Sequence, residues 1–139
     1  MFHHLFIPKI NCKAQQLEIR ESLIHGRGVF SKKVFKPGQL IEKAPVILIN
    51  DTEKGLLQHS CLHHYYFLVA NAAYPVVMGL GYSSLYNHSP AANAVYSISL
   101  RNLSITIKAC KKIDINEEIT VNYNGWPNDD SPVIFSTTD

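Results

Sequence analysis

Residues 81–93 read GYSSLYNHSPAAN, and this stretch decides the fold that we expect for the chain. It gathers two tyrosines, a histidine, two asparagines and several small turn-forming residues into one short segment. Asn and Ser side chains compete for backbone hydrogen bonds, and Pro90 removes a backbone donor. The stretch therefore predicts a bent loop, and neither a helix nor a strand.

Apolar sequence flanks this loop on both sides. Upstream, residues 76–80 form the apolar run VVMGL. Downstream, Tyr96, Ile98 and Leu100 alternate with serines, as in a strand with one buried face. A polar loop inside an apolar frame is a common place for functional residues.

The composition is that of a globular protein. We expect one domain over residues 1–139, with a core at about 17–124 and a loosely ordered tail over 125–139. The net charge is +2, and the lysine pairs at 32–33 and 111–112 are read as solvated surface, so no direct nucleic-acid partner is expected. No apolar run approaches the roughly 20 residues of a membrane span. The opening MFHHLFIP lacks the basic region of a signal peptide.

Cysteine usage favours a reducing, intracellular location such as the cytoplasm. Cys12, Cys61 and Cys110 are odd in number and widely spaced, which argues against a disulfide framework. The run Cys61-Leu62-His63-His64 contains possible zinc ligands, but no second ligand pair follows at a recognisable spacing. We favour a half-buried cysteine beside surface histidines, make the same judgement for His3-His4, and expect no metal site.

The first half of the chain predicts short strands and one short helix. Pro37-Gly38 predicts a type II turn, since Pro presets φ and Gly accepts a positive φ. Pro45 lacks an N–H, so it should force an edge or a bulge in its strand. The predicted elements are a strand around Leu17 and Ile19, a break at 25–28, a strand over 40–49, and a helix from Asn50 or Asp51 to Gln58.

The second half of the chain predicts further strands. Residues 65–70 are aromatic and apolar enough for a strand, and 95–100 with 104–109 predict a hairpin around Arg101-Asn102. After a turn at 114–118, Ile119, Val121 and Tyr123 share one side by period two. Tyr123 should therefore point in the same direction as the core residues.

Taken singly, the candidate catalytic motifs are weak. Gly26-Arg27-Gly28 opens like a dinucleotide-binding loop, but Ser31 and the absence of a following helix exclude that site. The triplet 87–89, Asn-His-Ser, lacks the nucleophile elbow of a serine hydrolase. The paired carboxylates Glu117-Glu118 lie in a turn, where a solvated face is more common than acid–base chemistry.

Taken in order, the motifs resemble those of the SET-domain protein lysine methyltransferases. These are the Gly-x-Gly near the first strand, Asn-His-Ser with Asn93 four residues after the Ser, and Glu-Glu-Ile-Thr-Val-Asn-Tyr over 117–123. The resemblance covers residues 17–124. It implies a mainly β, β-clip-like SET fold of short strands in several small sheets, with a C-terminal pseudoknot that places Tyr123 beside the central loop.

The resemblance also implies a cofactor and a set of site residues. S-adenosylmethionine would be held by the backbone around Gly26, Arg27 and Gly28, by Asn87 and by the backbone of His88, with no metal. Tyr82 and Trp126 are further candidates for this pocket; for Trp126 the choice between stacking on adenine and ordinary packing stays open. The expected partner is a protein that presents a lysine, not a membrane, and the oligomeric state is not fixed by the sequence.

Two tyrosines are implied in catalysis. Tyr123 would be the catalytic tyrosine, and Tyr96 lies where the family's tyrosine-or-phenylalanine switch controls how many methyl groups are added; the alternative for Tyr96 is a core tyrosine. The chain departs from the family at Pro90, at Ala92 and at Asn122, and residues 42–45 lack the usual tyrosine. A SET-like module that binds cofactor or a protein partner without turnover is therefore the alternative to an enzyme.

Overall fold

Strand β9 (Glu118–Val121) pairs with strands from three other parts of the chain, and it lies at the centre of the fold. The computed structural model describes residues 16–125 and 128–129. Within these residues β9 runs antiparallel to β2 (Arg27–Ser31) and parallel to β6 (Asn87–His88) and β7 (Ala94–Ser99). All of its last three residues are buried. The strand therefore behaves as an interior strand and not as an edge.

The remaining strands are joined to β9 in one hydrogen-bonded order, β1-β2-β9-β7-β8-β3-β5-β4, with β6 beside β9. The pairings fall into three groups, because β9 and β3 each change partner along their length. This confirms the mainly β prediction of short strands in small sheets. The other strands are β1 (Leu17–Glu21), β3 (Leu40–Ile49), β4 (Tyr66–Leu68), β5 (Val76–Gly79) and β8 (Ser104–Ala109).

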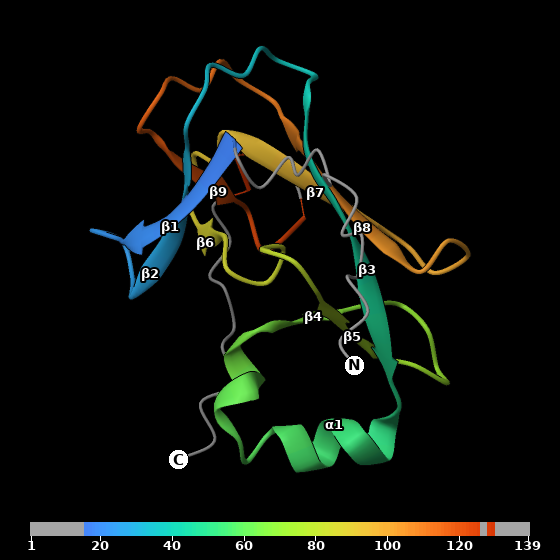
Figure 1. Cartoon of the computed structure of the whole chain (residues 1–139). Helices are drawn as coiled ribbons and strands as arrows, with labels where there is room; N and C mark the ends of the chain where they lie inside the picture. The colour runs from blue at the N-terminus through green and yellow to red at the C-terminus, as the bar shows by residue number, and fades with distance from the viewer. Residues whose placement is uncertain (1–15, 126–127, 130–139) are drawn as a thin grey trace, which may run out of the picture.

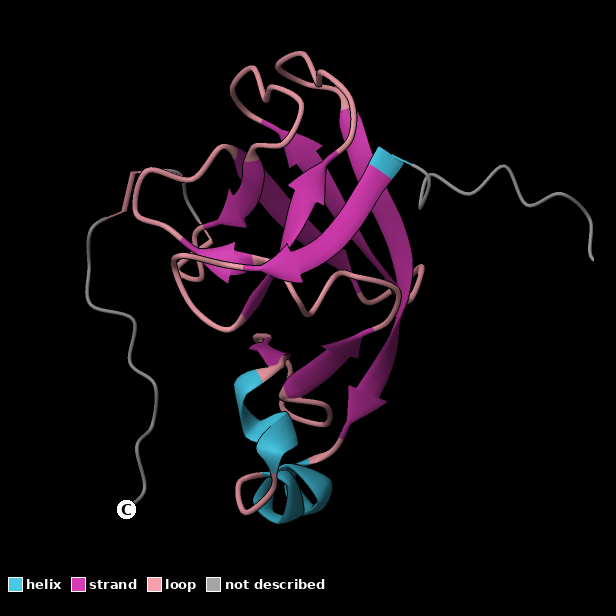
Figure 2. Cartoon of the chain, turned by 60° about the vertical axis from the view of Figure 1, so that its left-hand side comes forward, coloured by secondary structure: helices cyan, strands magenta, loops and turns pink. Residues whose placement is uncertain are grey.

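Two short helices lie together at one end of the molecule, away from β1, β2 and β9 (Figures 1 and 2). Helix α1 (Asp51–Leu57) is followed by the 3₁₀ turn η2 (Cys61–His64). Asn50 is the N-cap of α1, and its side chain and that of Glu53 form a reciprocal capping box. The predicted helix is confirmed, whereas η2 was not predicted.

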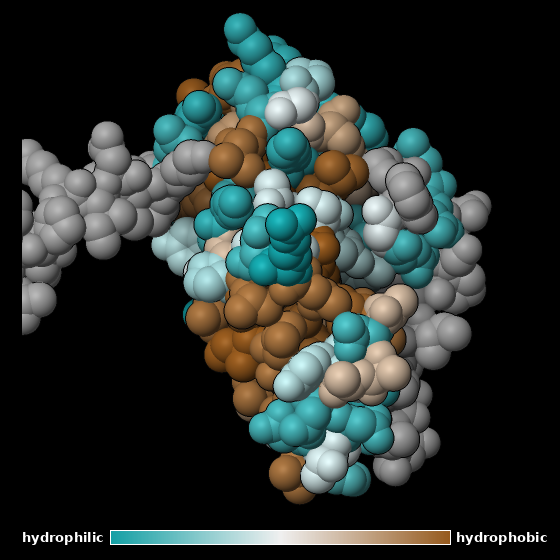
Figure 3. All heavy atoms as spheres, turned by 90° about the vertical axis from the view of Figure 1, so that its right-hand side faces the viewer, coloured by the Kyte–Doolittle hydropathy of each residue, from teal (hydrophilic) through white to brown (hydrophobic). Residues whose placement is uncertain are grey.

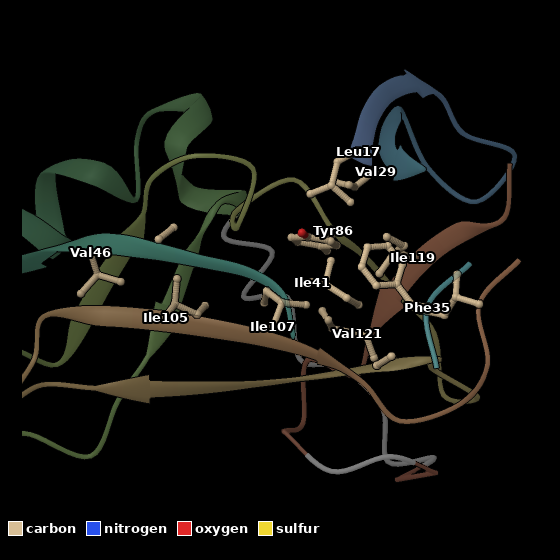
Figure 4. Close-up of a cluster of buried hydrophobic side chains, with 14 of the residues drawn as sticks. Leu17, Val29, Phe35, Ile41, Val46, Tyr86, Ile105, Ile107, Ile119 and Val121 are labelled. Carbon is tan, nitrogen blue, oxygen red and sulfur yellow. The ribbon is translucent and has the colours of Figure 1, made fainter. Parts of the chain in front are cut away.

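The core lies between the sheets and is built from alternating residues of β3, β7, β8 and β9. Figure 4 shows Tyr86 among Leu17, Ile41 and Ile119, with its phenol surrounded by aliphatic side chains. Burying such residues supplies most of the favourable free energy of folding. Tyr123 is half-buried and packs against this cluster, as its alternation with Ile119 and Val121 predicted.

The loop before β7 holds β9 through side-chain hydrogen bonds. Buried Asn93 donates through Nδ2 to the Glu118 carbonyl at 2.9 Å and accepts from the Thr120 N–H at 2.9 Å. Farther along, Ser89 N–H donates to the Val121 carbonyl at 3.1 Å. These contacts bring the loop and β9 together as the family resemblance predicted, while the threading of a pseudoknot stays a prediction.

Several local predictions are confirmed. Gly38 has φ +85°, and Gln39 N–H donates to the Lys36 carbonyl at 3.0 Å, which together describe a type II turn. Strands β7 and β8 form the predicted hairpin with an unbroken register from Ala94–Ala109 to Ser99–Ser104.

At Pro45 strand β3 has a strand partner on one side only, because its pairing with β8 ends at Pro45 and its pairing with β5 begins at Val46. The missing N–H is tolerated at such a local edge, as predicted, whereas the irregularity of β3 falls between Leu40 and Glu42 and not at Pro45.

One local prediction is wrong. The stretch 81–93 is not wholly loop, because Asn87 and His88 pair with β9. That short strand depends on a partner 33 residues away, Thr120 for Asn87, which local sequence does not reveal.

Hydrophobic residues also gather on part of the outer surface, below a more polar end (Figure 3). Ile47 of β3 and Leu68 of β4 are among the exposed apolar side chains. No helix of the described residues is long and apolar enough to cross a membrane.

The contacts of Asn93 predict a large stability effect. In Asn93→Ala the Thr120 N–H and the Glu118 carbonyl both lose their side-chain partner, so the free energy of unfolding should fall by about 3 kcal/mol. Chemical denaturation monitored by circular dichroism measures this. Asn102→Ala, in the exposed hairpin turn, is the control and should change stability by less than about 0.5 kcal/mol. Equal stabilities of the two variants would contradict the role given to Asn93.

Candidate functional site

A cavity of about 550 Å³ opens where β2, η2, the 81–93 loop and the segment after β9 meet. Five of the residues predicted from the sequence line it together: Gly26, Arg27, Asn87, His88 and Tyr123. Their sequence positions span almost a hundred residues, so only the pairing of β9 with β2 and β6 brings them into one place. The other lining residues are Ile24, His25, His64, Tyr65, Ser84 and Leu85.

Asn87 joins the three motifs by hydrogen bonds. Its Nδ2 donates to the carbonyl of His25 at 2.9 Å, to that of Arg27 at 3.1 Å and to Glu118 Oε1 at 2.8 Å. All three partners are acceptors, so they determine which side of the amide carries the nitrogen. The side-chain oxygen of this cavity-lining residue is consequently left to accept from a donor.

Glu118 completes this junction and explains Gly28. Ser22 Oγ donates to the two carboxylate oxygens at 2.9 and 2.8 Å. A Cβ placed on Gly28 would collide with Glu118 Oε1, so only glycine lets β2 approach the carboxylate this closely. Gly28 therefore lies behind the cavity and supports it, while Gly26, with φ +46°, lines it. The interpretation of Glu118 as a solvated surface residue is wrong.

Tyr123 lies against the wall of the cavity with its hydroxyl fixed. Its Oη donates to the main-chain carbonyl of Tyr86 at 2.8 Å. Burial, followed by the nearby Tyr65, Glu118 and Tyr96, raises the pKa of Tyr123 to about 12. The phenol is therefore protonated at neutral pH and can act as a hydrogen-bonding group, but not as a base.

His88 braces the backbone of Tyr123. Its Nδ1 accepts from the Tyr123 N–H at 3.0 Å, and the two rings lie 5.1 Å apart between centroids. Because Nδ1 accepts, the neutral imidazole carries its proton on Nε2. Burial lowers the pKa of His88 below its usual value, which favours this neutral form.

A second polar cluster lies beneath the 81–86 loop. Glu42 Oε2 accepts from the Tyr82 N–H at 2.9 Å, and Oε1 accepts from Tyr86 Oη at 3.0 Å. Burial raises the pKa of Glu42, although both hydrogen bonds oppose the shift. Burial and then the nearby Glu42 carboxylate raise the pKa of Tyr86 well above its usual value.

The remaining predicted residues lie apart from the cavity or outside the described chain. Tyr82 is not among the lining residues, because its backbone is drawn towards Glu42. Tyr96 does not line the cavity but contacts Tyr123: its Oη donates to the Tyr123 carbonyl at 3.3 Å, and its ring is 5.0 Å from that of Phe67. Trp126 lies outside the described residues.

Several lining residues were missed by sequence reasoning. His25 and Ile24 adjoin the Gly-x-Gly motif, and Ser84 and Leu85 lie in the loop already singled out, so their neighbours provided a signal. His64 and Tyr65 follow α1, and nothing local connects them with a site formed by β2 and β9. In residues 16–125 and 128–129 no group of three or more His, Cys, Asp or Glu side chains is arranged to hold a metal ion.

The departures from the family pattern at Pro90, Ala92 and Asn122 lie outside the cavity lining. Buried Asn122 donates to the Asp129 carbonyl at 2.7 Å and accepts from the Asn124 N–H at 3.0 Å, so it shapes the turn that follows β9. The Pro90 carbonyl accepts from Asn128 N–H at 3.1 Å, and Ala92 is fully buried. None of these residues lines the cavity.

Comparison with known proteins agrees with this geometry. Residues 26–124 match the SET domain family model. Over 108 residues the chain is 30% identical to a Schizosaccharomyces pombe protein named "Histone-lysine N-methyltransferase, H3 lysine-37 specific", which covers 77% of this chain and 72% of that protein.

Solved structures show the same fold. A Plasmodium falciparum protein described as a histone methyltransferase candidate superposes with a TM-score of 0.64 at 28% identity, over 78% of this chain and 92% of that one. A chain of the apo form of a ctPRC2 assembly superposes with a TM-score of 0.66 at 23% identity. The match covers 81% of this chain but only 15% of that much longer chain, so it supports the fold alone. The family match over residues 26–124 and the homologous relative together show that the chain belongs to the SET-domain family.

Proposed function

We propose that this SET-domain protein transfers a methyl group from S-adenosylmethionine to the side-chain amine of a lysine in a protein substrate. The observation that carries the proposal is the convergence of Gly26, Arg27, Asn87, His88 and Tyr123 on one cavity. These are the residues to which the family motifs assign cofactor binding and catalysis.

The cavity fits S-adenosylmethionine in size and in chemistry. Its volume of about 550 Å³ lies within the usual range for cofactor pockets. Gly26 and Arg27 offer backbone groups and a cation near the place proposed for the amino-acid end. The Asn87 amide is oriented so that its oxygen can accept from an ammonium group. Ile24, Leu85 and Tyr65 add apolar wall suited to an adenine ring.

When bound, the cofactor supplies a methyl group already activated by a sulfonium charge, so the protein needs to position it and not to activate it. Tyr123 is suited to positioning, since its protonated hydroxyl is held by the Tyr86 carbonyl and its backbone by His88. The oxygen of a protonated phenol carries partial negative charge, which favours a nearby positive charge.

The lysine amine has to be neutral to accept a methyl group, and its usual pKa is about 10.4. The rings of Tyr96 and Phe67 lie 5.0 Å apart between centroids, and the Tyr96 hydroxyl contacts the Tyr123 carbonyl, so two aromatic side chains lie near Tyr123. Such surroundings disfavour the charged form of an amine, and a cationic sulfonium nearby does the same. The two aromatic rings thus support an approach route for lysine beside Tyr123.

The relatives named as histone methyltransferases make a histone lysine the first substrate to test. The test is incubation with isotope-labelled S-adenosylmethionine and either histones or a proteome extract. Labelled lysine, identified by mass spectrometry, is the expected result. Cofactor binding without any labelled protein would favour the non-catalytic binding module.

Tyr123→Phe separates an enzyme from a binding module. It removes one hydroxyl and keeps the ring, so the fold and the cofactor affinity should be retained. The rate of methyl transfer should fall by about 100-fold or more, as when a preorganised hydrogen-bonding group is removed from an active site. Tyr74→Phe, at an exposed tyrosine, is the matched control and should keep wild-type activity. Unchanged activity in Tyr123→Phe would remove this residue from the mechanism.

Tyr96→Phe tests how many methyl groups are added. The Tyr96 hydroxyl is held beside Tyr123 by its bond to the Tyr123 carbonyl. We propose that it fills the space that a methylated amine would need for a second transfer. Wild type should yield mainly monomethyl-lysine, and the variant should shift the products towards di- and trimethyl-lysine with little loss of the first step. Mass spectrometry of a modified peptide resolves these products. An identical distribution from both proteins would leave Tyr96 as core packing only.

A further inference from the structure

Glu42 is a carboxylate for which neither the family motifs nor the cavity accounts. In β3 it lies on the same face of the strand as the buried Ala44 and Val46, so its side chain points towards the core. Both of its oxygens are occupied by one loop, since Oε2 accepts from the Tyr82 N–H at 2.9 Å and Oε1 from Tyr86 Oη at 3.0 Å. A buried carboxylate is unfavourable unless it is hydrogen-bonded in this way.

The backbone of the loop is adapted to this carboxylate. Gly81 has φ +61°, and a Cβ built on it would lie 2.5 Å from Glu42 Oε2. A side chain at this position would therefore be strained and would also meet the carboxylate. The loop bends at Gly81 next to the Glu42 carboxylate. The Tyr82 N–H then donates to one carboxylate oxygen, and the Tyr86 hydroxyl donates to the other.

Tyr86 connects this cluster with the proposed active site. It is 2% exposed, and its ring lies inside the core between Leu17 and Ile41 (Figure 4). The phenol end is fixed by Glu42, while the main-chain carbonyl accepts from the Tyr123 hydroxyl at 2.8 Å. The position of that carbonyl therefore depends on a side chain anchored on β3.

We propose that Glu42 is a positioning residue for methyl transfer: by holding Tyr82 and Tyr86 it fixes the Tyr86 carbonyl, and that carbonyl orients the hydroxyl of Tyr123. This inference rests on the proposed function, because it assigns Tyr123 to the reaction. Glu42 acts through the loop and touches neither the cavity nor the reacting groups.

The proposal distinguishes between substitutions at the same position. Glu42→Ala removes both acceptors, and Tyr86→Phe removes one donor while keeping the ring. Glu42→Gln can still make two hydrogen bonds: its oxygen can accept from the Tyr82 N–H, and its amide can donate to the Tyr86 oxygen, which reverses the direction of the wild-type bond. Hydrogen bonding, and not the negative charge, is what the positioning requires, so Glu42→Gln is the conservative rescue.

The kinetic test compares kcat with cofactor affinity at a temperature where every variant is folded. Glu42→Ala and Tyr86→Phe should lower kcat by about 10- to 100-fold, the loss expected when a reacting group is misplaced by a fraction of an ångström to one ångström. The Kd for S-adenosylhomocysteine should stay within about twofold, and Glu42→Gln should recover most of kcat. Tyr66→Phe is the matched control, because it removes a half-buried hydroxyl paired with His63 outside the loop, and it should keep kcat.

A second readout does not depend on activity. With tyrosines labelled by carbon-13 at Cζ, the Tyr123 signal is assigned by its absence in Tyr123→Phe. That signal should move in Glu42→Ala and Tyr86→Phe, but not in Tyr66→Phe. If both variants lose thermal stability yet keep the wild-type kcat and the wild-type Tyr123 signal, Glu42 only stabilises the fold and the inference is overturned.

The two readouts also separate the inference from the proposed function. A Tyr123 signal that moves in a protein without methyl transfer supports the coupling and contradicts the proposed function. If the wild type is active, and Glu42→Ala changes neither kcat nor the Tyr123 signal, the proposed function is supported and the coupling through Glu42 is contradicted.

Discussion

The burial of β9 is the constraint on which the rest of the structure depends. A strand whose last three residues are buried carries polar backbone groups into the interior, and the half-buried Glu118 side chain lies at its start, so each of these groups needs a partner. Strands β2, β6 and β7 satisfy part of this need, and the side chains of Ser22, Asn87 and Asn93 supply further hydrogen bonds. The polar loop is therefore required by the fold itself, quite apart from any ligand.

The same hydrogen bonds that satisfy β9 also assemble the site. Asn87 ties Glu118 to the backbone of residues 25–27, and in doing so it fixes the orientation of its own amide. Tyr123 comes two residues after β9 ends, so its position follows from the strand and is refined by His88 and Tyr86. Folding and preorganisation of the site are thus one process, and a catalytic geometry that relies on positioning benefits from this rigidity.

Sequence reasoning succeeded where the signal was local or carried by ordered motifs. Pro37-Gly38 dictates its own turn, Asn50 is one of the two predicted helix caps, and the motif order identified the five residues that share the cavity. It failed where a partner lies far along the chain. Glu118 looks solvated until Asn87 is brought against it, and the pairing of Tyr82 with Glu42, 40 residues away, is not visible locally. Tyr82 was predicted as a pocket residue because it is close in sequence to the Asn-His-Ser motif, but it does not line the cavity. Trp126 lies outside the described residues.

The central claim is that Asn87 joins the separated motifs into a binding site for S-adenosylmethionine. Isothermal titration calorimetry with S-adenosylhomocysteine tests this most directly, with wild type, Asn87→Ala and the exposed-turn variant Asn102→Ala. Wild type and Asn102→Ala should bind one equivalent with equal affinity, and folded Asn87→Ala should bind at least about tenfold more weakly, a loss of about 1.4 kcal/mol. Absence of binding by wild type, or an Asn87→Ala affinity equal to that of wild type, would contradict the account.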